Sequence, residues 1–262
     1  MLYQLMDQCL KNLDVTECCH DDGRECNCYI CLNKGYRETL DEYDCTKKMN
    51  YYVLKYGSSY ASEFYQYFDT SQIIEQYLNS HIKVLSLGCG FAPDYFALDK
   101  YIKEKKLNIS FEFTGIDNSN FWDTARINTQ SLEFIHQDIL NQLNFDNYDI
   151  IIVAKVFSTV YRHQKADIFL TNLKSSIQNT MKENAYLIFN DINSRNMGRD
   201  KLSRFMDKMF QHVRTYYCGN PPYVEQHWEI FRMNRMFFHI INNPKIDPLN
   251  QLRNNVFFEY RK

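Results

Sequence analysis

From residue 82 onward, short apolar segments alternate with longer amphipathic ones, and this alternation constrains the fold more than any other feature of the sequence. Apolar segments of this length predict β-strands, and the amphipathic segments between them predict helices. The fourth apolar segment is the kind of nearly continuous run found in strands buried on both faces of a parallel sheet. The five predicted strands are "IKVLSLG", "FEFTGID", "LEFIHQD", "YDIIIVAKVF" and "AYLIFNDI".

Two more apolar segments, "RMFFHII" (235–241) and "NNVFFEYRK" (254–262), lack a long helix between them and predict an antiparallel edge. The expected fold class is therefore α/β, with a seven-stranded, mostly parallel sheet and helices on both faces. Ahead of the first strand, residues 47–80 carry aromatic residues at helical spacings. Asp69 and Thr70 are expected to break this helix or to cap a second one at residues 71–78.

The composition favours a folded protein outside membranes. The N-terminus lacks the basic start and continuous apolar stretch of a signal peptide, and no apolar run approaches the roughly 18 residues of a membrane span. We therefore expect a soluble, cytoplasmic protein. The formal net charge of −2 gives no global reason to expect a nucleic-acid partner, although a local basic face is compatible with it.

Cysteine is concentrated at the N-terminus, where seven of the nine cysteines lie within the first 45 residues. In a reducing compartment, such clustering indicates metal binding rather than disulfides. Cys28 and Cys31 have the spacing of a zinc knuckle, and Cys26 and Cys45 are the best remaining pair of ligands. Possible substitutes are Cys18, Cys19 and His20. We expect a small zinc-binding lobe over residues 1–48, with structural zinc, and a larger domain over residues 49–262.

The first predicted strand ends in the turn Gly88-Cys89-Gly90, where a backbone without side chains allows a ligand to approach closely. A dinucleotide-binding fingerprint would need a third glycine where this chain has Pro93. A Walker phosphate loop would need Gly-Lys-Ser/Thr, which the turn lacks. The pattern therefore disfavours both kinds of phosphate cradle.

This turn and the strand ends that follow it resemble the class I S-adenosylmethionine (SAM) dependent methyltransferases, over roughly residues 50 to 262. The resemblance implies a Rossmann-like domain with SAM held around Gly88, Cys89 and Gly90. It also implies ribose binding by an acidic residue at the end of the second strand, which here is Asp117, followed by Asn118.

The same resemblance implies that Asp138 and Ile139, after the third strand, lie beside the adenine. Lys155, at the end of the fourth strand, would line the methyl donor, and Tyr60 on the preceding helix would close over the methionine end. An aromatic core stripe remains an alternative interpretation of Tyr60. The sequence departs from the family at Ser86, where the family usually has an acidic residue two positions before the first glycine.

The tetrapeptide Asn220-Pro221-Pro222-Tyr223 resembles the catalytic loop of N6-adenine DNA methyltransferases. In those enzymes the loop follows the fourth strand, whereas here it follows the helix after the fifth. We therefore interpret it as a turn, with an adenine-amino methyltransferase of rearranged motif order as the alternative. The catalytic candidates are Lys155 and two residues at the end of the fifth strand, Asn190 and Asp191, which could hold or deprotonate a nucleophile. The polar residues Asn193, Arg195 and Arg199 follow as candidates for substrate contact.

These features predict a SAM-dependent methyltransferase that acts on nucleic acid, with RNA favoured because a zinc lobe and aromatic surface suit unpaired bases. Two alternatives remain open at this point. One is a catalytically silent SAM-binding regulatory or partner subunit, with the Cys-rich lobe as a possible protein contact. The other is a small-molecule methyltransferase.

Overall fold

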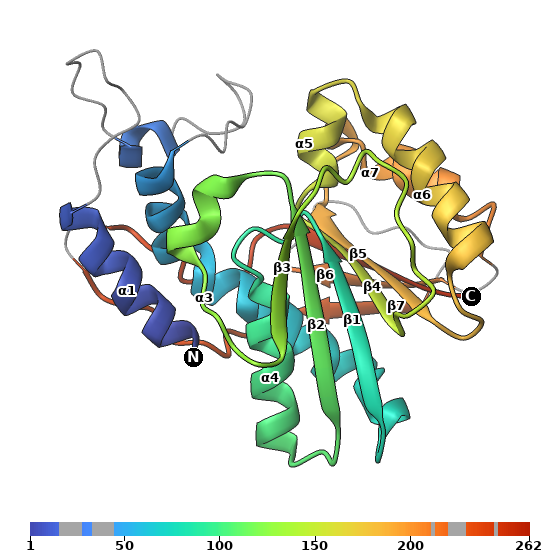
Figure 1. Ribbon diagram of the computed structural model, residues 1–262, viewed down its shortest axis with the longest axis horizontal. Coiled ribbons are helices and arrows are strands. Elements are labelled where there is room, and N and C mark those ends of the chain that lie inside the picture. The colour runs from blue at the N-terminus through green and yellow to red at the C-terminus, as the bar shows by residue number, and fades with distance from the viewer. Residues whose placement is uncertain (16–27, 33–44, 211–212, 220–228, 244–245) are drawn as a thin grey trace.

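The computed structural model describes residues 1–15, 28–32, 45–210, 213–219, 229–243 and 246–262. These residues form one eight-stranded sheet in the order β3-β2-β1-β4-β5-β8-β6-β7 (Figure 1). The strands are β1 His81–Leu87, β2 Ser110–Asp117, β3 Leu132–His136, β4 Ile150–Ala154, β5 Tyr186–Ile192, β6 Val213–Cys218, β7 Glu229–Met233 and β8 Asn255–Arg261.

The sheet confirms the predicted α/β class. The first five strands pair in parallel, and β8 runs antiparallel to both of its neighbours, β5 and β6. β7 is parallel to β6, so β8 is the one antiparallel strand among those described. β4 is buried at every position, as its apolar sequence predicts for a central parallel strand.

The described sheet has eight strands instead of the seven predicted, and the difference lies among the strands that follow β5 in the chain. The prediction of a strand at residues 235–241 is wrong. The backbone N–H groups of Phe237 and Phe238 donate to the Ser62 hydroxyl, at 2.9 Å each, and the Phe237 ring stacks on Tyr65 at 4.3 Å. Contacts with α3 therefore hold this segment outside the sheet and bury Phe238, and β6 and β7 supply the edge instead.

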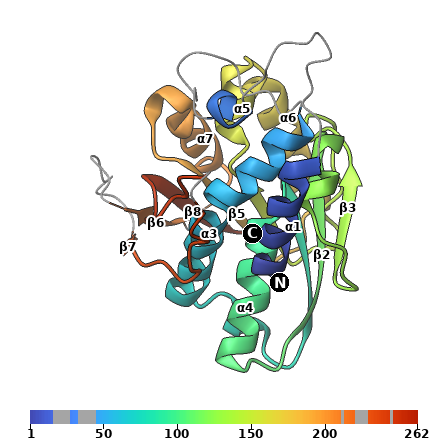
Figure 2. The ribbon, with the colours of Figure 1, turned by 90° about the vertical axis from the view of Figure 1, so that its left-hand side faces the viewer.

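Helices cover both faces of the sheet, and each face has its own apolar core. On one face lie α1 Leu2–Val15, α3 Thr46–Ser71 and α4 Pro93–Lys105 (Figure 2). On the other lie α5 Phe157–Arg162, α6 Ala166–Thr180 and α7 Arg199–Met206. Residues 28–32 form a further short helix, and 3₁₀ turns lie at η1 Ile74–Tyr77, η2 Asn120–Ala125 and η3 Arg195–Met197.

Helix α3 is longer than the sequence suggests. It continues through Asp69 and Thr70, where a break or cap was predicted, and the Asp69 carboxylate forms an ion pair with Lys105 of α4 at 2.5 Å. Gln72, with a φ of 55°, ends it in the left-handed conformation typical of a helix C-terminus. The second helix expected at residues 71–78 is reduced to the 3₁₀ turn η1.

Helix α1 packs against α3 through a face of apolar residues at three- and four-residue spacings. The buried members of this face are Leu2, Leu5, Met6, Cys9 and Leu13. Gln8 and Asn12 of α1 donate to the backbone carbonyl of Thr124 in η2, at 3.2 and 2.9 Å. No helix in the described ranges is long and apolar enough to cross a membrane.

Candidate active site

A cavity of about 580 Å³ opens at the carboxyl ends of β1, β2 and β4, which we call the donor cavity. Its volume is within the range of small-molecule and cofactor sites, and the position is where ligands bind in open α/β sheets. The predicted cofactor residues all line it: Tyr60, Gly88, Cys89, Gly90, Asp117, Asn118, Asp138 and Ile139. Lys155 lines it as well.

The turn after β1 needs glycine at two positions. Gly88 has a φ of +66°, and a Cβ added there would lie 2.5 Å from the Cβ of Val156. Gly90 has a φ of +53°, and its added Cβ would lie 3.2 Å from the Trp122 ring. Side chains at these positions would therefore be strained and would also clash with the cavity wall. The bare backbone is left facing the cavity, which suits close contact with a ligand.

Asp117 ends β2 and connects two parts of the cavity wall. One carboxylate oxygen accepts the Gly90 N–H at 2.9 Å, and the other accepts the Ser119 N–H at 3.0 Å. Burial raises the pKa of this carboxyl, while the two N–H groups partly oppose the shift. Each oxygen retains a lone pair beyond its backbone contact. Asp117 can therefore hold the glycine turn and accept ligand hydroxyls at the same time.

Asp138 and Ile139 follow β3 at the same edge of the sheet. The Asp138 carboxylate accepts the Leu140 N–H at 2.9 Å, which fixes the turn after the strand. Ile139 is 8 % exposed and presents an apolar side chain to the cavity. A carboxylate beside an apolar surface is suited to an adenine ring, which has an exocyclic amino donor and two flat faces.

Aromatic side chains from α3 and η2 form a wall of the cavity. Tyr52 and Trp122 line it and meet edge to face, with ring centroids 5.3 Å apart. Tyr60 also lines it and stacks on Tyr56 at 5.3 Å. Burial, followed by the neighbouring Tyr56 and Glu63, raises the pKa of the Tyr60 hydroxyl. Tyr60 therefore remains a neutral phenol that can donate a hydrogen bond.

Lys155 occupies a strained position directly after β4. Its φ of +56° is uncommon for a residue with a side chain, and its N–H donates to the Asn190 carbonyl at 2.7 Å. The ammonium group pairs with the fully buried Glu63 carboxylate of α3 and lies 4.5 Å from the Tyr60 ring centroid. The other Glu63 oxygen accepts from Asn255 of β8 at 2.6 Å. Three distant parts of the chain thus meet at this end of the cavity.

The structure does not bring Asn190 and Asp191 into the donor cavity. Asp191 is 2 % exposed and accepts the Ser158 N–H and hydroxyl at 2.8 Å each, and the Ile192 N–H at 2.7 Å. Burial raises its pKa, opposed by these hydrogen bonds. Asn190 is fully buried, and its amide donates weakly to the Val256 carbonyl at 3.5 Å. In this arrangement Asp191 anchors the start of α5, and neither side chain can touch a ligand in the cavity.

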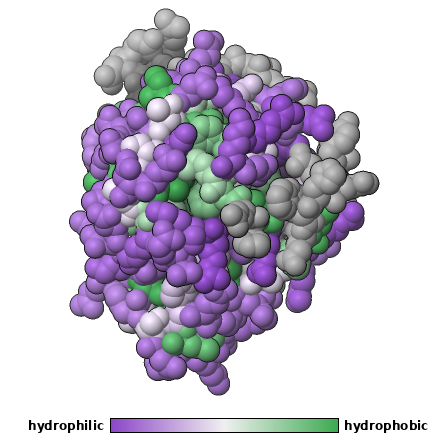
Figure 3. Space-filling model, turned by 90° about the vertical axis from the view of Figure 1, so that its right-hand side faces the viewer, coloured by the Kyte–Doolittle hydropathy of each residue, from purple (hydrophilic) through white to green (hydrophobic). Residues whose placement is uncertain are grey.

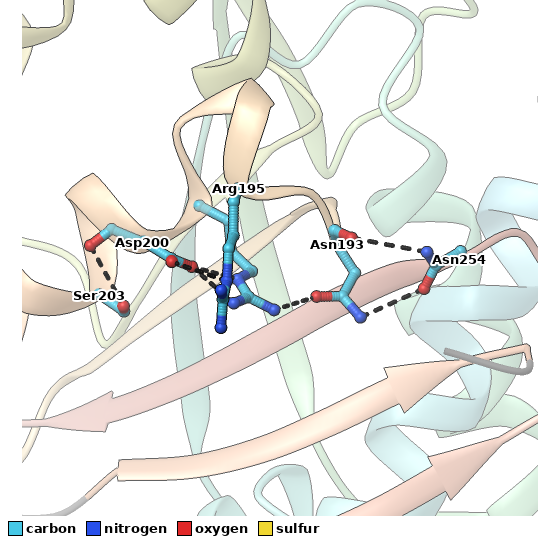
Figure 4. Close-up of polar contacts among 6 residues, drawn as sticks. Asn193, Arg195, Asp200, Ser203 and Asn254 are labelled. Atoms are coloured by element: carbon cyan, nitrogen blue, oxygen red, sulfur yellow. Dashed lines mark hydrogen bonds and ion pairs between the residues drawn. The ribbon is translucent and has the colours of Figure 1, made fainter. Parts of the chain in front are cut away.

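The polar residues after β5 form a separate cluster (Figure 4). The buried Arg199 guanidinium donates to the Asp200 carboxylate and to the Asn193 side chain. Asn193 in turn donates to Asn254 at 3.2 Å, and Arg195 pairs with Asp200 at 3.2 Å. The predicted substrate contacts are therefore grouped together but lie apart from the donor cavity.

Sequence reasoning missed Asp94, which is buried on the first turn of α4 next to the glycine turn. Neither of its carboxylate oxygens makes a hydrogen bond of good geometry in the described structure. Burial raises its pKa to about 6, and the nearby Ser86 hydroxyl lowers that pKa only in part. A carboxylate thus adjoins Ser86, the position where the family usually has its acidic residue. Glu63 and Asn255 were also not assigned a role, because no local pattern connects them to Lys155.

Two predictions fall partly or wholly outside the described residues. The tetrapeptide at residues 220–223 lies outside them, as does Cys26. Of the other predicted zinc ligands, Cys28 and Cys45 are buried with their sulfur atoms 3.6 Å apart, and Cys31 is half-buried. In the ranges that the structure covers, no three His, Cys, Asp or Glu side chains are grouped so as to hold a metal ion.

The strand order and the cavity define a Rossmann-like α/β domain with a ligand-sized site at the carboxyl ends of its first strands. A family model described as a methyltransferase domain matches residues 78–252, and this chain belongs to that family. The protein is a SAM-dependent methyltransferase. No curated protein matches the sequence closely enough to count as a relative.

Solved methyltransferase structures resemble the chain at low sequence identity. The N-methyltransferase NodS from Bradyrhizobium japonicum WM9, in complex with S-adenosylhomocysteine (SAH), is 12% identical, with a TM-score of 0.44 over 90% of this chain and 99% of that one. The CurJ carbon methyltransferase is 12% identical, with a TM-score of 0.48 over 79% and 56%. A putative ribosomal RNA methyltransferase from Plasmodium falciparum is 14% identical, with a TM-score of 0.46 over 79% and 98%. Likeness at this level assigns no acceptor.

Proposed function

We propose that the methyl acceptor is RNA, presented as an unpaired base to the donor cavity. The observation that supports this is the aromatic wall formed by Tyr52, Phe91 and Trp122, which continues at the cavity rim into Phe121. Phe121 is 42 % exposed, so its ring is accessible from solvent at the side of the cavity. Unpaired bases are recognised by stacking on aromatic side chains of this kind.

The transfer itself needs little more than positioning. The SAM sulfonium gives its methyl group in line to a nucleophilic atom, and SAH leaves with a neutral sulfur. The enzyme contributes by holding the two reactants close together and excluding water. Tyr60 and Lys155, at the end of the cavity after β4, can donate hydrogen bonds that orient an acceptor there.

The direct test is to incubate the purified protein with SAM carrying a deuterated methyl group and with total RNA, DNA or a small-molecule extract. Mass spectrometry then locates the label. Labelled nucleosides in the RNA digest are the expected result. Label confined to a small molecule would replace RNA with a small acceptor. SAM binding without any labelled product would indicate a catalytically silent subunit.

A matched pair of variants tests the stacking role. Phe121→Ala should raise the KM for RNA about fivefold to a hundredfold, because one stacked base contributes roughly 1–3 kcal/mol. Phe121→Tyr keeps a flat ring and should remain near wild type. Calorimetry with SAM is the control, since Phe121 also lines the donor cavity. An unchanged KM for RNA in Phe121→Ala would argue against stacking at this position.

We also propose that the Cys-rich segment holds a structural zinc ion through Cys28 and Cys45. Two thiolates on a tetrahedral zinc, each at about 2.3 Å, lie about 3.8 Å apart. The observed sulfur separation of 3.6 Å is close to this distance and far from the roughly 2.05 Å of a disulfide. Elemental analysis should find about one zinc per chain, and Cys28→Ser should lower both zinc content and thermal stability. Zinc-free protein of ordinary stability would contradict this proposal.

A further inference from the structure

A second hollow, of about 390 Å³, lies between α5, α6 and α7, and we call it the basic hollow. Figure 3 views the molecule from the side where these helices lie, and hydrophilic residues cover most of that face. Four basic side chains line the hollow, against two acidic ones. The basic residues are Arg195, Lys201, Arg204 and Lys208, and the acidic ones are Asp167 and Asp200.

The positive charge of the hollow is not fully neutralised by its own acidic residues. Lys201 pairs with Asp167 at 2.7 Å, and Arg195 pairs with Asp200 at 3.2 Å. Arg204 and Lys208 are exposed and form no ion pair with any described residue. The hollow thus has an excess of two positive charges, on a chain whose formal net charge is −2. Such a local excess attracts anions even where the whole protein does not.

The wall that carries these charges is rigidly supported. The buried Arg199 holds Asp200 and Asn193 together, and Asn193 reaches Asn254 just before β8 (Figure 4). This network fixes the first turn of α7 against the end of the sheet. Arg204 lies on α7 and Lys208 lies two residues beyond its end, so both follow directly from the helix that this network anchors.

Helix α5 separates the basic hollow from the donor cavity. Tyr161 of α5 lines the hollow, whereas Thr159 and Val160 of the same helix line the donor cavity. Basic residues continue across this boundary, because His163 and Lys165 lie on the rim of the donor cavity. The exposed Lys165 ammonium therefore adds a positive charge at the donor cavity to those in the hollow.

We propose that the basic hollow binds backbone phosphates of single-stranded RNA whose target base enters the donor cavity. Arg204 and Lys208 are the main phosphate contacts, with Lys165 closer to the target base. A basic groove leading to an aromatic-walled pocket is the combination by which single strands are bound without sequence preference. The inference deepens the proposed RNA acceptor and rests on it.

The test compares Arg204→Ala/Lys208→Ala with the control Lys11→Ala/Lys103→Ala. The control removes two exposed lysines on α1 and α4, on the other face of the sheet, and so changes the net charge equally. Fluorescence anisotropy of a labelled 12-nucleotide RNA is followed between 50 and 300 mM KCl. Losing two phosphate contacts should reduce the slope of log K against log salt by about 1.4 and lower affinity about tenfold at 100 mM salt. The control variant should behave like wild type.

The outcomes separate this inference from the acceptor proposal. If the two double variants bind RNA equally well, the basic hollow is not the phosphate site, whatever the labelling experiment shows. If Arg204→Ala/Lys208→Ala selectively loses RNA affinity but wild type leaves RNA unlabelled, the hollow stands as an RNA site and the acceptor proposal fails. SAM affinity, measured by calorimetry, should be unchanged in both double variants because none of the four residues lines the donor cavity.

Discussion

The Lys155 ammonium and the Glu63 carboxylate form an ion pair that is almost completely withdrawn from water at the end of the donor cavity. Lys155 leaves β4 in the left-handed conformation, and Glu63 comes from the middle of α3. Asn255 satisfies the second carboxylate oxygen. The pair therefore joins α3 to the end of β4 and neutralises a cation that lines the donor cavity.

Removing one partner of this ion pair should lower the free energy of unfolding more than removing both partners. Glu63→Gln leaves a buried ammonium without its carboxylate and should lower the free energy of unfolding by about 3–5 kcal/mol. Glu63→Gln/Lys155→Met should recover much of that loss. Urea unfolding of the three proteins measures the difference. A loss below 1 kcal/mol in Glu63→Gln would mean that the pair contributes little.

The same variants should change the preference between SAM and SAH. With Glu63→Gln, the unpaired Lys155 cation repels the sulfonium of SAM but not the neutral sulfur of SAH, because only SAM carries a charge there. The ratio of SAM to SAH affinity should therefore fall about tenfold or more at low salt, as expected for about 1.4 kcal/mol of repulsion. Calorimetry with both ligands gives the ratio, which a purely structural defect would leave unchanged.

Asp117 should affect SAM affinity in two ways that substitutions can separate. Asp117→Ala removes the predicted ribose acceptor and the contact with the Gly90 N–H, so it should weaken SAM binding by roughly 1.5–3 kcal/mol. Asp117→Asn keeps one carbonyl oxygen that can still hold the glycine turn, and should lose less. Calorimetric SAM affinities equal to wild type in both variants would remove Asp117 from the cofactor site.

The sequence predicted the five parallel strands and the cavity-lining residues because their signals are local. A buried strand appears as an apolar run, and the residues that end it, such as Gly88, Asp117 and Asp138, follow within a few positions. The carboxyl ends of parallel strands then meet at one edge of the sheet, regardless of the conformation of the loops between them.

The structure differs from these expectations where long-range contacts decide it. Residues 235–241 have a strand-like sequence, but the Ser62 hydroxyl of α3 accepts the N–H groups of Phe237 and Phe238. Asp191 ends its strand as Asp117 does, yet Ser158 occupies its carboxylate. The pairing of Glu63 with Lys155 spans 92 residues, so no spacing in the sequence could indicate it.

Asp191 is expected to act on stability rather than on chemistry. Asp191→Ala leaves the Ser158 hydroxyl and N–H without their acceptor, which should lower the free energy of unfolding by about 2–4 kcal/mol. Asp191→Asn retains one acceptor and should lose less. With saturating SAM and below the unfolding temperature, methyl transfer by both variants should stay within a few-fold of wild type. A stable Asp191→Asn protein with a hundredfold slower turnover would restore Asp191 as a catalytic residue.

Asp94 should make the protein less stable as the pH rises. Its pKa is raised from 3.8 to about 6 in the folded state, so the folded protein holds this proton over a pH range in which the unfolded chain has released it. Stability therefore falls between about pH 4 and pH 6 and remains lower above that range, by up to about 3 kcal/mol.

Asp94→Asn removes this titration, so it should be more stable than wild type at pH 8. Its advantage should shrink by about 1–2 kcal/mol at pH 5, where part of the wild-type population keeps the proton. Urea unfolding at the two pH values measures this, with the exposed Asp146→Asn as the control that should show no such trend. The ionised Asp94 carboxylate lowers the free energy of unfolding, so its place beside Ser86 indicates that it helps to hold the glycine turn. The Asp94→Asn protein should therefore be more stable than wild type but bind SAM more weakly. Equal stability of wild type and variant at both pH values would mean that the buried carboxylate is satisfied in solution.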